Sequence, residues 1–404
     1  MEKKQMKRKG THKSINKTIT PTFIRAIILS FPIVFLIVHK AMIGNLTLED
    51  FFSIDTFTAI IIAFLCQTIA DFVVKIIESK NEDSLKLTEN NEGLLKKYNR
   101  ANLLQFGNET FPTVCLLRRN CEDAPFHFVF DDTSYNKKYQ LPAQIASNSD
   151  HLMKAHAHSK IYNQLNIRLD NIKQINNDII LSYSQTYYYD SLITNRSMDY
   201  CWENGKSIRE VYEPGPFLSD LASSKLSNHL GFNGFLETSD EKIIFVKRGK
   251  DLSIGKSTWS GSIGASLKAM YALNEDQKLY AKGLSNAIKA EIQDELYIEI
   301  GEDVDLSKSI FAFYRDLVEG GKPQFLFYYK LDNYTFETFE KNFKQRYEKN
   351  NNVVDGTEFI GLSIEECRKC ELASNGIVYN GNFYKMTASA SSSMAMLFQY
   401  LGSN

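Results

Sequence analysis

From position 113 onward, the pattern of hydrophobic and polar residues predicts a mixed α+β fold. Six short runs rich in β-branched and aromatic residues are typical of strands. These runs cover residues 113–117, 126–130, 178–183, 242–246, 309–313 and 324–331. Apolar residues at helical spacing predict helices over residues 145–165, 288–298 and 336–348. The combination favours antiparallel strands with helices packed on the faces of the sheet.

Two longer apolar segments precede this region and predict a two-helix transmembrane hairpin. Residues 23–43 are overwhelmingly apolar around an uncharged centre of 13 residues. Their total of 21 residues is enough for a bilayer span, which takes about 20. Residues 57–74 form a second segment, interrupted mainly by Gln67 and Asp71. We therefore expect two membrane spans joined by residues 44–56.

Two alternatives compete with the hairpin. A basic head followed by a short apolar centre also fits a cleaved signal peptide, but no small-x-small cleavage site follows it and a second apolar segment does. A pair of buried core helices is less consistent with residues 59–65, which are apolar on every face rather than along one stripe. The pattern favours the membrane hairpin over both.

The distribution of charge predicts the orientation of the hairpin. The first 25 residues hold eight basic side chains and one acidic side chain, whereas the rest of the chain holds 39 basic and 47 acidic ones. The connecting loop carries Glu49, Asp50 and Asp55 and no basic residue. By the positive-inside rule, both termini are expected to be cytoplasmic. Asp71 then belongs either to a polar path or to an interfacial ion pair with Lys75.

These patterns divide the chain into four parts. Residues 1–20 form a basic cytoplasmic tail, residues 21–80 the hairpin, residues 81–170 a linker and extension, and residues 171–404 the main folded domain. The formal net charge of -1 argues against a strongly basic nucleic-acid binder. Six cysteines in 404 residues are too sparse for a disulfide scaffold.

A cluster of carboxylates is the strongest chemical signal in the folded domain. Glu291, Asp294 and Glu295 lie at positions i, i+3 and i+4 of a predicted helix, so the three side chains share one face. Leu284, Ile288, Ile292 and Leu296 recur every four residues and predict an opposite face packed into a core. Oxygen ligands of this kind suit Mg²⁺ or Mn²⁺. A solvated acidic helix face is the alternative.

The surroundings of this cluster resemble those of the Nudix box. The segment Ala-Glu-Ile-Gln-Asp-Glu-Leu-Tyr-Ile at residues 290–298 is similar to the box's catalytic helix. Residues 230–249 look like the strand-turn-strand before the box, with Ser239 and Asp240 at the turn. Residues 259–264 look like its glycine-bearing loop, and residues 313–327 resemble the hairpin that follows it. The resemblance implies a Nudix-like αβα sandwich.

Carried over from the family, Glu291, Asp294 and Glu295 imply a site that binds Mg²⁺ and activates water to cleave a diphosphate linkage. Ala290, however, replaces the box arginine, and Tyr297 replaces its glycine. These departures favour a domain that binds a nucleotide without hydrolysing it.

A membrane hairpin ahead of such a domain resembles the membrane-anchored Nudix-like effectors of bacterial cyclic-oligonucleotide anti-phage signalling (CBASS). That resemblance implies a receptor for a cyclic di- or trinucleotide made by a partner nucleotidyltransferase. It also implies a multi-pass protein of the bacterial inner membrane. Ligand binding would promote homo-oligomer assembly and disrupt this lipid bilayer through the hairpin, with no cofactor required. Expected contacts are base stacking on aromatic rings and phosphate pairing with basic groups. The candidates for these contacts are Trp259, Tyr314, Lys247, Arg248 and Arg315.

Two other functions remain open from the sequence. The first is a membrane-tethered, Mg²⁺-dependent Nudix hydrolase of nucleoside-diphosphate-linked compounds, in which Glu291, Asp294 and Glu295 are catalytic. The second is a scaffold that binds no small ligand. The sequence does not determine which cyclic nucleotide binds or how many subunits assemble.

Overall fold

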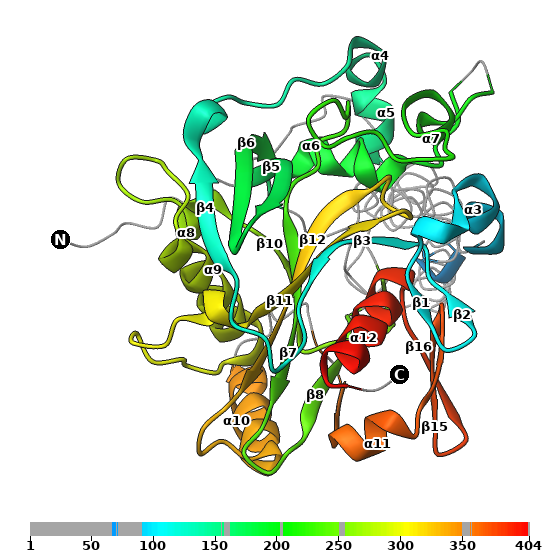
Figure 1. Cartoon of the computed structure of the whole chain (residues 1–404). Coiled ribbons are helices and arrows are strands. Elements are labelled where there is room, and N and C mark those ends of the chain that lie inside the picture. The colour runs from blue at the N-terminus through cyan, green and yellow to red at the C-terminus, as the bar shows by residue number, and fades with distance from the viewer. Residues whose placement is uncertain are drawn as a thin grey trace, which may run out of the picture. The chain divides into compact units, whose positions relative to one another are not determined.

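The computed structural model describes residues 67–69, 71, 91–154, 156, 162–202, 205–249, 255–349, 356 and 358–402. The chain divides into two units, one made of Met1–Gly10 and Leu87–Asn404 and the other of Thr11–Lys86. The fold below is that of the described residues of the first unit (Figure 1).

An eight-stranded mixed sheet forms the centre of this unit. Its main path runs β13-β8-β7-β12-β11-β3, with β10 added beside β7 and β9 beside β8. Strands β7 and β12 are parallel, and the other pairs in this sheet are antiparallel. The strands are β3 (Thr113–Arg118), β7 (Gly231–Glu237), β8 (Ile243–Lys247), β9 (Trp259–Ser260), β10 (Ile263–Ser266), β11 (Ile310–Asp316), β12 (Lys322–Lys330) and β13 (Glu358–Leu362).

Both faces of this sheet are buried. Alternate residues of β8 face opposite sides, because side chains alternate along a strand. Ile244 and Val246 join a core cluster that contains the apolar residues of α9, while Ile243 and Phe245 join a second cluster that contains those of α12. Figure 1 shows α9 and α12 on opposite sides of the sheet. The helices over the sheet and at its end are α8 (Ala269–Ala272), α9 (Ala281–Leu296), α10 (Phe336–Lys349) and α12 (Ala388–Tyr400).

Smaller sheets and short helices flank this centre. Strands β4 (His127–Asp131), β6 (Asp178–Tyr187) and β5 (Leu165–Ile175) form one three-stranded sheet, in the order given. Backbone bridges from Asn166 to Lys268 and from Arg168 to His229 tie β5 to the segments around β7 and β10. The other strands and α-helices of the described residues are β1 (Gln105–Phe106), β2 (Glu109–Thr110), β14 (Glu371–Ala373), β15 (Gly376–Tyr379), β16 (Asn382–Lys385), α3 (Asn91–Lys97), α4 (Ala143–Ala146), α5 (Ser149–Lys154), α6 (Tyr188–Leu192), α7 (Ile208–Tyr212) and α11 (Ile364–Arg368).

The fold class expected from the sequence is wrong. Within the described residues, no helix is long and apolar enough to cross a bilayer. The transmembrane hairpin, the multi-pass inner-membrane location with cytoplasmic termini, and the bilayer as a partner are therefore withdrawn. Apolar length and flanking charge, on which the expectation rested, are required for a bilayer span but do not establish one. The structure instead shows a mixed α/β fold with several sheets.

The two apolar segments lie largely outside the described residues. Residues 23–43 are all outside them, and of residues 57–74 only residues 67–69 and 71 are described. Gln67 and Asp71, the candidate membrane residues, are both half-buried.

The strand predictions for the folded part were confirmed. All six expected runs correspond to strands, namely β3, β4, β6, β8, β11 and β12. Helices α9 and α10 were also confirmed, although α9 begins seven residues earlier than expected, at Ala281. The single helix expected over residues 145–165 was wrong, because that region contains the short helices α4 and α5 and ends at the start of β5. Residues 259–264, expected to be a loop, contain β9 and the start of β10.

Candidate functional site

A polar cavity of about 280 Å³ lies where several elements of the main sheet meet α9 and the start of α12. Its wall combines four basic side chains, three carboxylates, and several amides and hydroxyls. We call it the charged cavity. The lining residues used below are Tyr162, Tyr188, Arg196, Asn233, Arg248, Gly264, Ser266, Lys268, Glu291, Glu295, Glu319, Lys322, Gln324, Thr387 and Ser389.

One wall of the charged cavity is a buried ion-pair network. Glu319 lies in the turn between β11 and β12, where its Oε2 is 3.1 Å from Nζ of Lys322 and its Oε1 is 3.7 Å from Nε of Arg196. Burial by itself would raise the pKa of Glu319, but Lys322 and then Arg196 hold that pKa below its ordinary value. The Arg196 guanidinium lies over the ring of Tyr188, 5.1 Å from its centroid. This wall therefore presents fixed positive charge with a carboxylate between the two cations.

Arg248 approaches the charged cavity from the end of β8. A Cβ atom on Gly264 would lie 3.3 Å from its Nη1, and a Cβ atom on Gly255 would lie 3.4 Å from its Nε. Because Gly264 has no side chain, the space next to the Arg248 guanidinium stays open. Because arginine remains charged and can donate several hydrogen bonds in one plane, Arg248 suits the recognition of an oxyanion.

A hydrogen-bonded row of polar side chains forms the sheet side of the charged cavity. Asn233 donates from Nδ2 to Oε1 of Gln324 at 2.9 Å and to the hydroxyl of Tyr314 at 2.8 Å. Gln324 donates from Nε2 to Oγ of Ser389 at 3.0 Å. Ser389 stands in the first turn of α12, where Thr387 caps the helix by accepting from the amide of Ala390. The row fixes its side chains, and the amino-terminal end of α12 adds a partial positive charge.

Two of the three carboxylates of α9 lie on the wall of the charged cavity. Glu291 and Glu295 line the charged cavity, whereas Asp294 is exposed outside it. Leu284, Ile288, Ile292 and Leu296 are buried in the core. The apolar face of α9 was therefore confirmed. Two of the three predicted carboxylates, Glu291 and Glu295, lie together at one cavity.

Lys268 neutralises Glu291 by an ion pair between its Nζ and Oε1 of the glutamate. Lys268 is the residue before α8, and α8 packs closely on α9. Gly283 permits that packing, because a Cβ atom at this position would lie 2.0 Å from the carbonyl oxygen of Ala272. The close approach of the two helices therefore brings Lys268 to the carboxylates.

Tyr297 ends α9 in a left-handed conformation, with φ 59° and ψ 27°. Its amide donates to the carbonyl oxygen of Gln293. In the resemblance noted from the sequence, Tyr297 stands in place of the Nudix-box glycine, and glycine is the residue that adopts positive φ at least cost. Contact of the Tyr297 ring with that of Phe343, at 5.5 Å between centroids, offsets part of the backbone strain.

The carboxylate set does not fit a Nudix-type divalent metal site. Glu291 is already paired with Lys268, and Asp294 does not reach the charged cavity. Within the described ranges, no group of three or more His, Cys, Asp and Glu side chains could hold a metal ion. A site for Mg²⁺ needs several oxygen ligands at nearly octahedral positions. No catalytic step through a metal is therefore derived.

The five residues predicted to bind ligand lie in different places. Arg248 lines the charged cavity. Lys247 forms an ion pair with Glu358 at 2.8 Å, and Trp259 and Tyr314 are buried at 8% and 0% exposure. Because their faces are covered in this structure, base stacking on Trp259 or Tyr314 stays a prediction.

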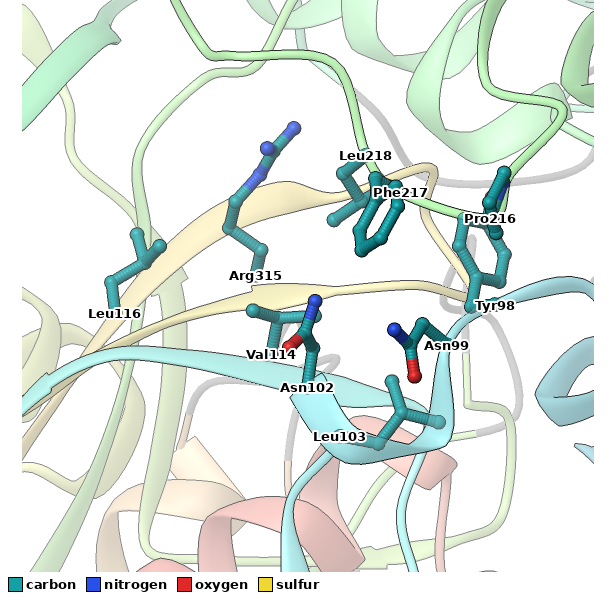
Figure 2. A pocket seen from close by; sticks show the side chains of 10 residues that line it. All are labelled: Tyr98, Asn99, Asn102, Leu103, Val114, Leu116, Pro216, Phe217, Leu218 and Arg315. Atoms are coloured by element: carbon teal, nitrogen blue, oxygen red, sulfur yellow. The ribbon is translucent and has the colours of Figure 1, made fainter.

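Arg315 lies at a second, mostly apolar cavity of about 140 Å³ (Figure 2). Its Nε donates to the carbonyl oxygen of Gly321 at 2.8 Å, and its Nη1 donates to that of Ser219 at 2.6 Å. Figure 2 shows its guanidinium beside Leu218 and Phe217. Burial lowers its pKa from the ordinary value. Two of its nitrogens therefore hold backbone segments together, which leaves its predicted phosphate contact without direct support here.

Several cavity residues were not anticipated. Arg196, Lys268 and Lys322 were missed, as were Asn233 and Gln324 on the neighbouring strands β7 and β12. The parallel pairing of β7 with β12 joins segments about 90 residues apart in the sequence. No local sequence pattern indicates that juxtaposition. The sequence feature that came closest to indicating a cavity residue was the Gly320–Gly321 turn of the predicted hairpin, which Lys322 directly follows.

Comparison with known proteins adds little to this picture. No family model and no curated protein sequence matches the chain. Among solved structures, part of the chain is similar to the crystal structure of DR0079 from Deinococcus radiodurans, at 14% sequence identity and a TM-score of 0.22. That match covers 35% of this chain and 70% of the other. A likeness this weak supports no inference about fold or function.

Proposed function

We propose that this protein is a receptor for a cyclic di- or trinucleotide, which it binds through a phosphate group in the charged cavity. The observation that carries the proposal is the convergence of Arg196, Arg248, Lys268 and Lys322 from separate parts of the chain. Cations brought together in a recess attract anions and form charge-assisted hydrogen bonds with phosphate oxygens.

The rest of the lining supports a nucleotide rather than a simple anion. Asn233, Gln324 and Ser389 present amide and hydroxyl groups, which can recognise sugar hydroxyls and base edges. The volume of about 280 Å³ is near the lower end of the ~300–1,000 Å³ common for ligand sites. One nucleotide unit would therefore occupy the charged cavity, with the remainder at its rim. Tyr162 lines the rim and is 66% exposed, so its ring is open to stack on a base.

The proposal covers ligand recognition alone. The disruption of a bilayer by a hairpin is not part of it, since that expectation was withdrawn with the fold class. Assembly of the ligand-bound protein into a homo-oligomer and its pairing with a nucleotidyltransferase remain predictions from the sequence.

Isothermal titration calorimetry of the full chain against a panel of cyclic di- and trinucleotides tests the proposal. We expect Arg248→Met to weaken binding of the responding ligand at least about tenfold, because a hydrogen bond to a charged group contributes about 1.5–3 kcal/mol. Lys247→Met is the matched control. It removes the neighbouring basic residue, which pairs with Glu358 outside the charged cavity, and should change affinity less than about twofold.

Three results would count against the proposal. Equal losses in the two variants would move the binding site away from the charged cavity. Heat from none of the panel, together with Mg²⁺-dependent cleavage of nucleoside-diphosphate compounds, would favour the hydrolase. If neither cyclic-nucleotide binding nor cleavage of nucleoside-diphosphate compounds is observed, a scaffold is favoured.

A further inference from the structure

Lys268 places a permanent positive charge against the carboxylates of α9. The side chain of Glu291 is 5% exposed and that of Lys268 is 20% exposed. Burial alone would lower the pKa of Lys268, but the Glu291 carboxylate and then that of Glu295 outweigh it, and the pKa is raised from its ordinary value. The ammonium group therefore stays charged beside both carboxylates.

The fold fixes Lys268 in this position. Its backbone forms a bridge with Asn166 of β5, and its carbonyl oxygen accepts hydrogen bonds from the amides of Tyr271 and Ala272 in α8. Gly283 then holds α8 close against α9. Because strand, helix and helix contact all constrain the residue, the lysine is a built part of the cavity wall rather than a mobile surface group.

A divalent cation at Glu291 would compete directly with this ammonium group. It would have to displace Lys268 or sit beside it, and like charges at contact distance repel strongly where water is largely excluded. Glu291 and Glu295 both line the charged cavity, and ions such as Mg²⁺ commonly bind one or two carboxylates and keep several waters. The two side chains could therefore hold such an ion only if the ammonium group of Lys268 were removed.

We infer that Lys268 takes the place of a divalent cation at the carboxylate helix, so that the charged cavity receives phosphate on protein cations alone. The first half of this inference concerns the empty protein and stands by itself. The second half rests on the proposed function.

The claim that Lys268 takes the place of a divalent cation is tested by titrating the full chain with Mn²⁺ in the absence of nucleotide. The electron paramagnetic resonance signal of the free ion measures how much Mn²⁺ is bound. The wild type should show no site that depends on Glu291. Lys268→Met should bind one equivalent of Mn²⁺ at least about tenfold more tightly than the wild type does, because Glu291 and Glu295 lose their counter-charge. Adding Glu291→Gln to that variant should abolish the gain.

Lys289→Met is the matched control on the same helix. Its Nζ donates to the backbone oxygens of Gly301 and Glu302, outside the charged cavity, so Mn²⁺ binding should be unchanged. Should Lys268→Met not fold, as judged by circular dichroism, Lys268→Gln carries the same expectation, since it keeps hydrogen-bond donors without the charge. The inference is overturned if the wild type binds an equivalent of Mn²⁺ that Glu291→Gln removes, or if loss of Lys268 yields no tighter site.

The second half is tested with the cyclic nucleotide that responds in the calorimetric panel. Its affinity should agree within about twofold in EDTA and in excess Mg²⁺. A tenfold or greater requirement for Mg²⁺ would overturn metal-free binding. If no nucleotide binds, the proposed function fails, and the manganese experiment still decides the role of Lys268.

Discussion

Lys322 and Glu319 form an ion pair across the turn between β11 and β12, with 3.1 Å between Nζ and Oε2 and both side chains almost fully buried. The pair forms part of the wall of the charged cavity. A buried carboxylate depends on such a partner, because the loss of one member leaves an uncompensated charge in a medium of low polarity.

The ion pair predicts strong coupling in a double-mutant cycle. Lys322→Met should lower the free energy of unfolding by about 3 kcal/mol, since Glu319 loses one of its cationic partners. Combining it with Glu319→Gln should restore at least about 1 kcal/mol, because the unpaired charge is gone. Urea unfolding measures both. Effects that add within about 0.5 kcal/mol would show that the pair is not coupled.

Asp316 predicts a pH dependence of stability. Burial, and secondly the Glu319 carboxylate, raise the pKa of Asp316 from 3.8 to about 7, while its Oδ1 accepts a hydrogen bond from the amide of Val318. A carboxyl whose pKa is higher in the folded state binds its proton more tightly there. It therefore stabilises the fold below pH ~4, and that contribution is lost as the pH rises toward ~7.

Asp316→Asn removes this titration and keeps an oxygen to accept from Val318. Its stability relative to the wild type should be lowest near pH 4 and should increase up to about pH 8, by about 1.4 kcal/mol for each unit of pKa shift. Chemical unfolding at four or five pH values gives the comparison. A difference that is flat or falls with pH would contradict the raised pKa.

Arg209 holds the turn before Glu319 through hydrogen bonds to its backbone. Its side chain is 1% exposed, it pairs with Asp199, and it donates to the carbonyl oxygens of Leu317 and Val318 at 2.6 and 2.8 Å. Lysine cannot reproduce this planar set of bonds.

Arg209→Lys should therefore lower the free energy of unfolding by about 3 kcal/mol. Arg118→Lys is the control, since Arg118 is exposed and donates a hydrogen bond to the side chain of Gln399 at the surface. This variant should change stability by less than about 0.5 kcal/mol. Similar changes in the two variants would mean that the buried network contributes little.

The left-handed end of α9 predicts an unusual order of stability. Tyr297→Ala loses the contact with Phe343 and keeps the strained backbone, whereas Tyr297→Gly loses the same contact and relieves the strain. The glycine variant should be more stable than the alanine variant by about 1 kcal/mol, the cost of positive φ for a residue with a Cβ. Thermal or chemical unfolding decides it. Alanine equal to or above glycine would contradict the strain.

The parts of the fold that the sequence predicted are those encoded locally. The β-branched and aromatic runs of β8 and β12 and the four-residue spacing from Leu284 to Leu296 are each visible in neighbouring residues. Helix α12 was missed because its run of alanines and serines lacks a polar face and is buried between elements distant in sequence. The membrane hairpin was inferred from hydropathy and flanking charge, with no packing information to weigh against them.

The same distinction applies to the charged cavity. Glu291 and Glu295 were found because their spacing places them on one helix face. Lys268 reaches them because the absence of a side chain at Gly283 lets α8 pack closely against α9. The spacing of residues in the sequence does not indicate this contact. Arg248 and Arg315 look alike in sequence, yet the first lines the charged cavity and the second is bound to backbone carbonyls. Long-range packing decides which charged residue lines the charged cavity.

A crystal structure of the chain with the tightest-binding cyclic nucleotide of the panel tests the central claim most directly. The account predicts one phosphate group inside the charged cavity, within hydrogen-bond distance of Arg248 and Lys322, and no metal ion between it and Glu291. A nucleotide bound elsewhere, for example beside Arg315 in the apolar cavity, would contradict it.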